Sequence, residues 1–149
     1  MPVIYLYTYI KAPIERCFDL SRSVDVHMQS TSGTSEKAVA GVTSGLMGLN
    51  DTVTWRARHL GFYQYLTSQI TAFEPPNFFV SQMVKGIFKK IYHRHAFKSF
   101  EEGTLMIDIF DYEAPLGWLG TLADKLFLEQ YMKELLRKRN ECIKQMAEK

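Results

Sequence analysis

The chain has 149 residues, of which 46% are hydrophobic and 23% charged, and these values are typical of a globular protein rather than a disordered or fibrous one. This length suits one domain with its own core, so we expect residues 1–149 to form a single domain. The net charge of +2, without a broad basic stripe, argues against a protein that binds nucleic acid.

The two cysteines, Cys17 and Cys142, lie far apart among apolar neighbours, and we interpret both as buried reduced thiols rather than a disulfide. The sequence begins almost at once with a strand pattern, so we expect no signal peptide. It also has no apolar run of about 18 residues, the length that a membrane-spanning helix requires. We therefore expect a soluble cytoplasmic protein without an integral membrane segment.

The N-terminal part of the chain predicts one strand and two short helices. Val3–Lys11 is almost wholly β-branched and aromatic, which is typical of a strand. Pro13 suits the first turn of a helix, and the apolar residues after it recur at helical spacing. A second short helix is expected over Ser21–Gln29, with Ser21 or Ser23 as its N-cap.

From Ser30 onward the hydrophobic pattern has a period of two, and short turn sequences separate its runs. Such short gaps predict hairpins, and hence an antiparallel meander. The expected strands are Glu36–Val42, Asp51–His59, Tyr63–Phe73, Phe78–Lys85, Lys89–Phe100 and Thr104–Glu113.

A long helical pattern follows the last strand, from about Leu119 or Thr121 to Ala147. At 1.5 Å per residue it would span roughly 40 Å, and such a helix must bury its apolar stripe against the sheet. We interpret the basic cluster Arg137-Lys138-Arg139 as part of a solvated face. The predicted apolar face consists of Leu128, Tyr131, Leu135, Cys142 and Met146.

Several short motifs accompany these elements: Ala12-Pro13-Ile14-Glu15 with Phe18, Val53 to His59 with Gly61, His93 to Phe97, Gly103-Thr104 with Asp108, and Ala114 to Gly117. In their order and spacing they resemble the START-like, or helix-grip (SRPBCC), superfamily, most closely its small bacterial polyketide cyclase/dehydrase-like members. The resemblance covers essentially the whole chain. It implies an α+β fold in which a seven-stranded antiparallel curved sheet grips the C-terminal helix around an apolar cavity. Members bind lipids, sterols, polyketides, flavonoids or hormones, and a minority are enzymes.

The register of the last hairpin decides which polar residues meet. If it turns on Glu101-Glu102, His95 lies opposite Asp108, whereas a three-residue loop with Gly103 as a bulge shifts the register by one and separates them. The recurring residues of the family favour the first register. That register also places His93 opposite Phe110, Phe97 opposite Met106 and Ile91 opposite Tyr112, and a similar argument places Trp55 opposite Leu66.

Strand alternation then predicts the side chains that contact a ligand in the cavity. They are Trp55, His59, Leu66, Ile70, Phe79, Met83, His93, His95, Phe97, Asp108, Phe110, Leu128, Tyr131 and Leu135. This mixture of apolar and aromatic residues with a few polar groups is usual for a small-molecule site. Tyr5, Tyr7 and Tyr9 share one face of the first strand, and we interpret them as core or sheet-face packing, with ligand contact as the alternative.

His59, His93, His95 and Asp108 form the candidate chemical cluster. His95 and Asp108 could be a buried hydrogen-bonded pair, could orient a polar group of a ligand, or could act as general base and orienting acid. His93 and His95 on one strand face would also permit metal chelation, but a metal site needs converging ligands and we expect none. The sequence has no G-x-S-x-G elbow, Walker loop or G-x-G-x-x-G motif, and we expect no cofactor.

We favour binding or transport of a hydrophobic small molecule, such as a lipid, polyketide or aromatic metabolite. The alternative is a cyclase/dehydrase-type enzyme that uses His95, Asp108 and His59 as acid–base groups. A third alternative is an interaction module, including a homodimer formed through edge strands. The sequence shows no apolar surface patch in favour of this third alternative.

Overall fold

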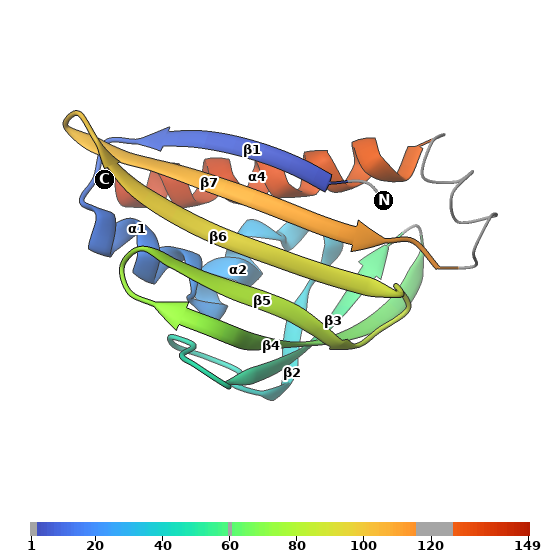
Figure 1. Ribbon diagram of the computed structural model, residues 1–149. Coiled ribbons are helices and arrows are strands. Elements are labelled where there is room, and N and C mark those ends of the chain that lie inside the picture. Colours follow the sequence, from blue (N-terminus) through green and yellow to red (C-terminus); the bar gives the residue numbers. More distant parts are fainter. Residues whose placement is uncertain (1–2, 60, 116–126) are drawn as a thin grey trace.

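The computed structural model describes residues 3–59, 61–115 and 127–149 of the chain. In these residues, seven antiparallel strands form one curved sheet in the order β1-β7-β6-β5-β4-β3-β2 (Figure 1). The strands are β1 (Val3–Ile10), β2 (Lys37–Gly41), β3 (Thr52–His59), β4 (Phe62–Glu74), β5 (Phe78–Lys85), β6 (Lys90–Phe100) and β7 (Gly103–Glu113). Every predicted strand is present, and its bounds agree with the prediction within one residue at each end.

The helices in the described residues are α1 (Ile14–Ser21), α2 (Val24–Ser30), a short 3₁₀ turn η1 (Ser32–Thr34) and α4 (Glu129–Ala147). Helix α2 begins later than predicted, and its cap is Ser23, whose hydroxyl accepts a hydrogen bond from the Val26 amide. The predicted start of the long helix, at Leu119 or Thr121, lies outside the described residues. No helix in the described part of the chain is long and apolar enough to cross a membrane.

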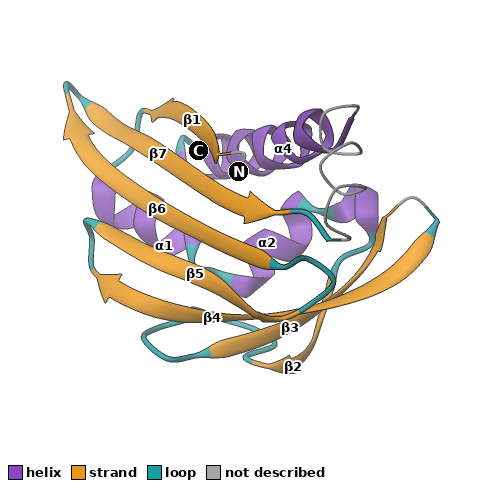
Figure 2. Ribbon diagram, turned by 45° about the vertical axis from the view of Figure 1, so that its right-hand side comes forward, coloured by secondary structure: helices purple, strands orange, loops and turns teal. Residues whose placement is uncertain are grey.

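Helices α1, α2 and α4 lie on one side of the sheet, which curves around them (Figures 1 and 2). Helix α4 lies beside β1, and both α1 and α2 contact α4. Phe18 of α1 joins the helical layer to the sheet, because its ring packs against Phe79 and Phe97 at centroid distances of 5.4 Å in each case. This arrangement is the predicted helix-grip architecture, in which the sheet holds the C-terminal helix.

The β6–β7 hairpin turns on Glu101-Glu102, because Phe100 pairs with Gly103 and His95 lies opposite Asp108. The two-residue turn is therefore confirmed, and the alternative in which Gly103 forms a bulge is wrong. Gly103 is needed for another reason: a Cβ atom there would collide with the backbone carbonyl of Ile10 in β1. The other predicted pairs are also confirmed: His93 with Phe110, Phe97 with Met106, Ile91 with Tyr112, and Trp55 with Leu66.

The buried stripe of α4 differs from the predicted one. It consists of Leu136, Arg139, Asn140, Ile143 and Ala147, whereas Cys142 and Met146 are only half-buried. The prediction that Arg139 belongs to a solvated face is wrong, since a buried carboxylate on the sheet compensates its charge. The predicted burial of Cys142 is also wrong, because the buried stripe of α4 passes beside this residue. Cys17 is buried as expected, and both thiols are free.

The tyrosines of β1 lie on the face of the sheet that points away from the helices. Tyr5 and Tyr7 are 57% and 64% exposed, so sheet-face packing describes them and core packing does not. Tyr9 packs edge-on against Phe100 at a centroid distance of 6.1 Å.

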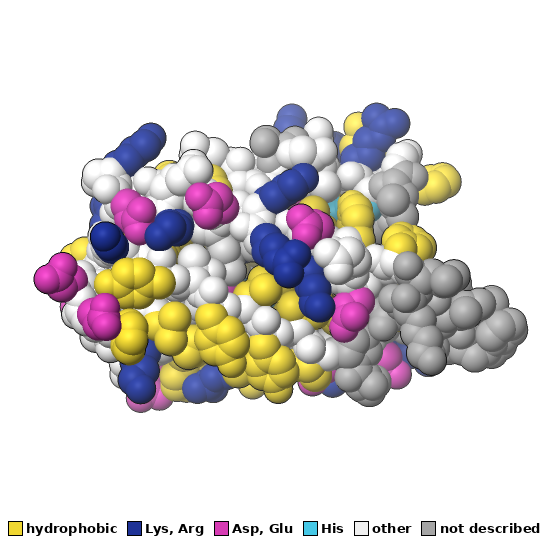
Figure 3. All heavy atoms as spheres, turned by 90° about the horizontal axis from the view of Figure 1, so that it is seen from above, with side chains coloured by type: hydrophobic (Ala, Val, Ile, Leu, Met, Phe, Trp, Pro, Cys, Tyr) yellow, Lys and Arg dark blue, Asp and Glu magenta, His cyan; other side chains and the backbone are white. Residues whose placement is uncertain are grey.

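Seen from above, hydrophobic side chains form a band along one side of the molecule, with Lys and Arg beside them (Figure 3). The surface is thus more apolar than expected from the sequence.

Candidate functional site

A cavity of about 420 Å³ lies between the concave face of the sheet and the helices. Its walls are mainly apolar and come from β3 to β7, α2 and α4. Trp55 and Ile70 belong to the sheet wall, and Leu135 and Leu136 to the helical wall. The alternation of β3 to β5 explains the sheet wall, because every second side chain points to the concave face.

Most of the side chains predicted to contact a ligand line this cavity. They are Trp55, His59, Leu66, Ile70, Phe79, Met83, His93, His95, Phe110, Leu128, Tyr131 and Leu135. The other two do not: Phe97 packs in the core against Phe18, and Asp108 is fully buried behind His93. Both point to the expected face of the sheet, but neighbouring side chains cover them.

Sequence reasoning missed the cavity residues contributed by helices and turns. Among them are Arg22, His27, Glu36, Met47, Ile87, Phe88 and Arg139. For Arg139 a signal was present, since it lies three residues after Leu136 and four before Ile143, on their helical stripe. Strand alternation could not place the others, because it says nothing about segments outside the strands.

The cavity reaches the protein surface at one end. Ile87 and Phe127 line it and are 52% and 46% exposed, so they mark its rim. At the same rim, Nδ1 of His59 and the hydroxyl of Tyr131 are 2.8 Å apart, which joins the end of β3 to the start of α4. Burial lowers the pKa of His59 and raises that of Tyr131. The rim is therefore apolar, with one polar bridge between sheet and helix.

A second polar pair lies on the wall formed by α2. Nε2 of His27 is 2.7 Å from Oε1 of Glu36, and the His27 ring lies 4.2 Å from that of Trp55. All three residues line the cavity. This pair joins α2 to the segment that follows it, and the His27 ring joins α2 to Trp55 of β3.

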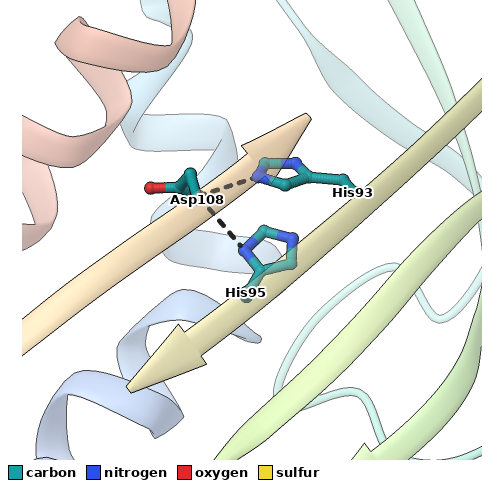
Figure 4. A group of neighbouring side chains, drawn as sticks. All are labelled: His93, His95 and Asp108. Carbon is teal, nitrogen blue, oxygen red and sulfur yellow. Dashed lines mark hydrogen bonds and ion pairs between the residues drawn. The ribbon is translucent and has the colours of Figure 1, made fainter. Parts of the chain in front are cut away.

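The inner wall of the cavity carries a buried polar cluster around Asp108, whose side chain has no exposed surface (Figure 4). Oδ1 of Asp108 lies 2.7 Å from Nε2 of His93 and 3.4 Å from Nη1 of Arg139. Oδ2 accepts a hydrogen bond of 2.7 Å from the amide of Asn140. Each carboxylate oxygen is thus paired, as a buried charge requires.

The partner of Asp108 is not the histidine that the sequence indicated. His95 lies directly opposite Asp108, but its Nδ1 is 3.7 Å from Oδ1, beyond a hydrogen bond. That nitrogen instead accepts a bond of 3.1 Å from Nη2 of Arg139. Asp108 bonds to His93, its diagonal neighbour, because long side chains reach diagonally across a strand pair. Of the three interpretations of His95 and Asp108, the one in which they form a direct hydrogen-bonded pair is therefore wrong.

The electrostatics of the cluster favour neutral histidines between one anion and one cation. Burial, the neighbouring His93 ring and the Arg139 guanidinium hold the pKa of His95 well below its usual range. Burial also lowers the pKa of His93, although its bond to Asp108 opposes this shift. For Asp108, burial raises the pKa, but the His93 bond and the charge of Arg139 outweigh it, so the net shift is downward.

His93, His95 and Asp108 present donor atoms close together, as a metal site would. However, Oδ1 of Asp108 and Nδ1 of His95 are both within hydrogen-bond distance of the Arg139 guanidinium. A guanidinium is a permanent cation, and it lies where these two atoms would have to share a metal ion. The arrangement fits an arginine-centred cluster better than a metal centre.

Comparison with known proteins supports the fold. No protein-family model and no curated protein matches the chain. Solved structures do match: the protein TTHA0849 from Thermus thermophilus has a TM-score of 0.75 and 22% identity, over 95% of this chain and 97% of that one. A START superfamily protein from Mycobacterium smegmatis has a TM-score of 0.73 and 14% identity, over 98% and 97% of the chains. Ginseng major latex-like protein 151 from Panax ginseng has a TM-score of 0.72 and 17% identity, with the same coverage.

At these identities the comparison establishes architecture and no more. Nearly the whole chain superposes on START-like and latex-like proteins, so it has the helix-grip fold that the motifs around Pro13, His93 and Pro115 predicted.

Proposed function

We propose that this helix-grip protein binds or carries a hydrophobic small molecule, such as a lipid, polyketide or aromatic metabolite, in the cavity between sheet and α4. The observation that carries the proposal is an apolar cavity of about 420 Å³ that the protein's own side chains leave unfilled. Small-molecule sites have volumes of roughly 300–1,000 Å³ and largely apolar walls with a few polar groups.

Energetics support this proposal. Protein interiors are normally packed to the density of organic crystals, and a cavity lowers stability in proportion to its volume. The large residues Trp55, Phe79 and Leu135 line the cavity without closing it. A ligand that occupied this space would restore the missing contacts and so offset the loss of stability that the cavity causes.

A cyclase/dehydrase-type enzyme is our second candidate, because the cavity wall includes a histidine bonded to a buried carboxylate. In such an enzyme His93 is the base that Asp108 orients, while His95 and His59 are further acid–base candidates. Asp108→Asn and His95→Ala would then remove turnover of a polyketone, measured under conditions in which each variant is still folded. We favour binding, because the permanent cation Arg139 already occupies the inner end of the cluster.

Native mass spectrometry of the protein as purified, followed by denaturation and identification of what is released, tests the proposal. We expect a stoichiometric apolar molecule, or uptake of one when the apo protein is incubated with a lipid extract. The variant Leu135→Trp, which directs a larger ring into the cavity, should lose this mass. Lys138→Trp, on the exposed face of the same helix, is the matched control and should retain it. A clean apo mass in both experiments would overturn the proposal.

Two further expectations accompany this function. A cytoplasmic location stays a prediction from the sequence. Dimerisation also stays a prediction: β1 and β2 are the edges of the sheet, and β1 bears the exposed Tyr5 and Tyr7. Light scattering after size-exclusion chromatography, with Tyr7→Lys as the disrupting variant, measures the oligomeric state.

A further inference from the structure

Hydrogen bonding within the Asp108 cluster determines which nitrogen of His95 carries a proton. Nδ1 of His95 lies 3.1 Å from Nη2 of Arg139, and a guanidinium has donors but no acceptor. Nδ1 must therefore accept this bond and carry no hydrogen. Burial beside Arg139 keeps the ring neutral by lowering its pKa, so its one proton lies on Nε2.

The opposite tautomer follows for His93. Its Nε2 lies 2.7 Å from Oδ1 of Asp108, and an ionised carboxylate only accepts hydrogen bonds. Arg139 and Asn140 also donate to Asp108, which keeps the carboxylate ionised. Nε2 of His93 therefore donates its proton to Asp108, and Nδ1 of the neutral ring is left as an acceptor.

The remaining nitrogens are Nδ1 of His93 and Nε2 of His95. Among the residues that the structure describes, neither nitrogen has a hydrogen-bond partner. Neither is among the fully buried polar atoms that lack a partner, so both are accessible from the cavity. Both point away from Asp108 (Figure 4), and both histidines line the cavity. The two rings are stacked at a centroid distance of 3.7 Å. The cavity wall thus presents one acceptor and one donor side by side.

We propose that this pair recognises a hydroxyl group on an otherwise apolar ligand, which donates its proton to Nδ1 of His93 and accepts one from Nε2 of His95. This inference rests on the proposed function, and it adds the polar chemistry of the ligand. An alcohol or phenol satisfies both nitrogens with one oxygen atom, which is the chemical match for an adjacent donor and acceptor.

Charged head groups fit the wall less well. The charges of Asp108 and Arg139 cancel, and both histidines are neutral, so the cluster offers no net charge to a ligand. A carboxylate has no proton for Nδ1 of His93, and an ammonium group has no lone pair for Nε2 of His95. The terminal nitrogens of Arg139 already contact Asp108, Asn140, His95 and the backbone carbonyl of Ser21.

Two isomeric ligands, one with and one without a hydroxyl group, measure how much the hydroxyl contributes to affinity. Decan-1-ol and 1-methoxynonane have the same formula, but the ether cannot donate a hydrogen bond, and decanoate is the charged comparison. Displacement of the neutral probe N-phenyl-1-naphthylamine gives the three affinities. We expect the alcohol to bind roughly tenfold more tightly than the ether, as one donated hydrogen bond implies, and more tightly than decanoate.

Variants then assign the preference to the two histidines. His93→Phe keeps an aromatic ring but removes the acceptor, and it should abolish the preference for the alcohol. His95→Phe removes the donor and should weaken alcohol and ether alike. Met83→Leu, an apolar change in the same cavity, is the matched control and should preserve the ratio of alcohol to ether. The ligand series in the unmodified protein is informative even if a histidine variant does not fold.

The failures of the two proposals are distinguishable. Equal binding of alcohol and ether, or tighter binding of decanoate, would overturn recognition of a hydroxyl and leave apolar binding intact. If neither the probe nor any of the three ligands binds, the proposed function fails, and recognition of a hydroxyl fails with it.

Discussion

Asp108 is the residue on which the buried polar cluster depends. Its carboxylate is fully buried and lies within 3.4 Å of a buried guanidinium, that of Arg139. A buried charge that loses its partner is far less favourable than the intact pair, because the surviving ion lacks both water and a counter-charge. The cluster therefore contributes to stability as well as to the chemistry of the cavity wall.

We predict that Asp108→Asn lowers the free energy of unfolding by roughly 3–5 kcal/mol, because Arg139 is left buried without a counter-charge. The matched control is Asp111→Asn on the same strand. Asp111 pairs with the partly exposed Lys90, and the loss there should not exceed about 1 kcal/mol. Urea denaturation measures both values. Similar losses in the two variants would contradict a stabilising role for the buried pair.

We also predict that stability falls as the pH decreases below about 6.5, the ordinary histidine pKa. Burial lowers the pKa values of His93, His95 and His59 in the folded protein, so the unfolded chain binds more protons in this range. Each histidine contributes a slope of at most about 1.4 kcal/mol per pH unit, lost as its folded pKa is approached. Asp108 acts in the same direction, but only near pH 4 and below.

Urea denaturation between pH 7 and pH 5 measures this slope. His95→Phe should make it shallower, because one buried titratable ring is removed. An unchanged slope in that variant would show that His95 does not titrate differently in the folded and unfolded states.

At the scale of elements, α4 connects the cluster to the hydrophobic core. Its buried stripe begins with Leu136, continues through Arg139 and Asn140, and ends in Ile143 and Ala147. The polar members face the sheet because Asp108 pairs with both of them. The helix is therefore held by apolar packing at both ends of the stripe and by ionic pairing in the middle.

We predict that Ile143→Ala lowers the free energy of unfolding by about 2–5 kcal/mol, since this side chain is 1% exposed and leaves a cavity. Lys138→Ala, on the exposed face of α4, should change it by less than about 0.5 kcal/mol. Thermal or urea unfolding provides the comparison. If the two substitutions have equal effects, the assigned buried face of the helix is wrong.

At the scale of the whole molecule, the sheet and α4 enclose space instead of packing fully against each other. A ligand that fills this space binds the folded state alone and must stabilise it. Decan-1-ol at tenfold its dissociation constant should raise the free energy of unfolding by about 1.4 kcal/mol, which corresponds to a shift in Tm of roughly 3–6 °C. Thermal unfolding with and without the alcohol measures this shift. Leu135→Trp should abolish it, and a shift that survived would place the ligand elsewhere.

Local features of the sequence determined most of the architecture. Alternation of apolar residues, turn sequences such as Glu101-Glu102, and the proline at position 13 specify strands, hairpins and the first helix through short-range physics. Pairing register followed from the same signals, since a slip of one residue would turn a whole buried face toward water. For this reason most of the expected cavity side chains do point inward.

Tertiary structure decided the chemistry of the site. The sequence placed His95 opposite Asp108, but side chains reach diagonally, and the choice of His93 follows from Arg139 taking Nδ1 of His95. Arg139 lies 31 residues after Asp108, and only the rotation of α4 about its axis brings the two together. The volume of the cavity likewise depends on sheet curvature and side-chain packing across all elements, which no local pattern in the sequence encodes.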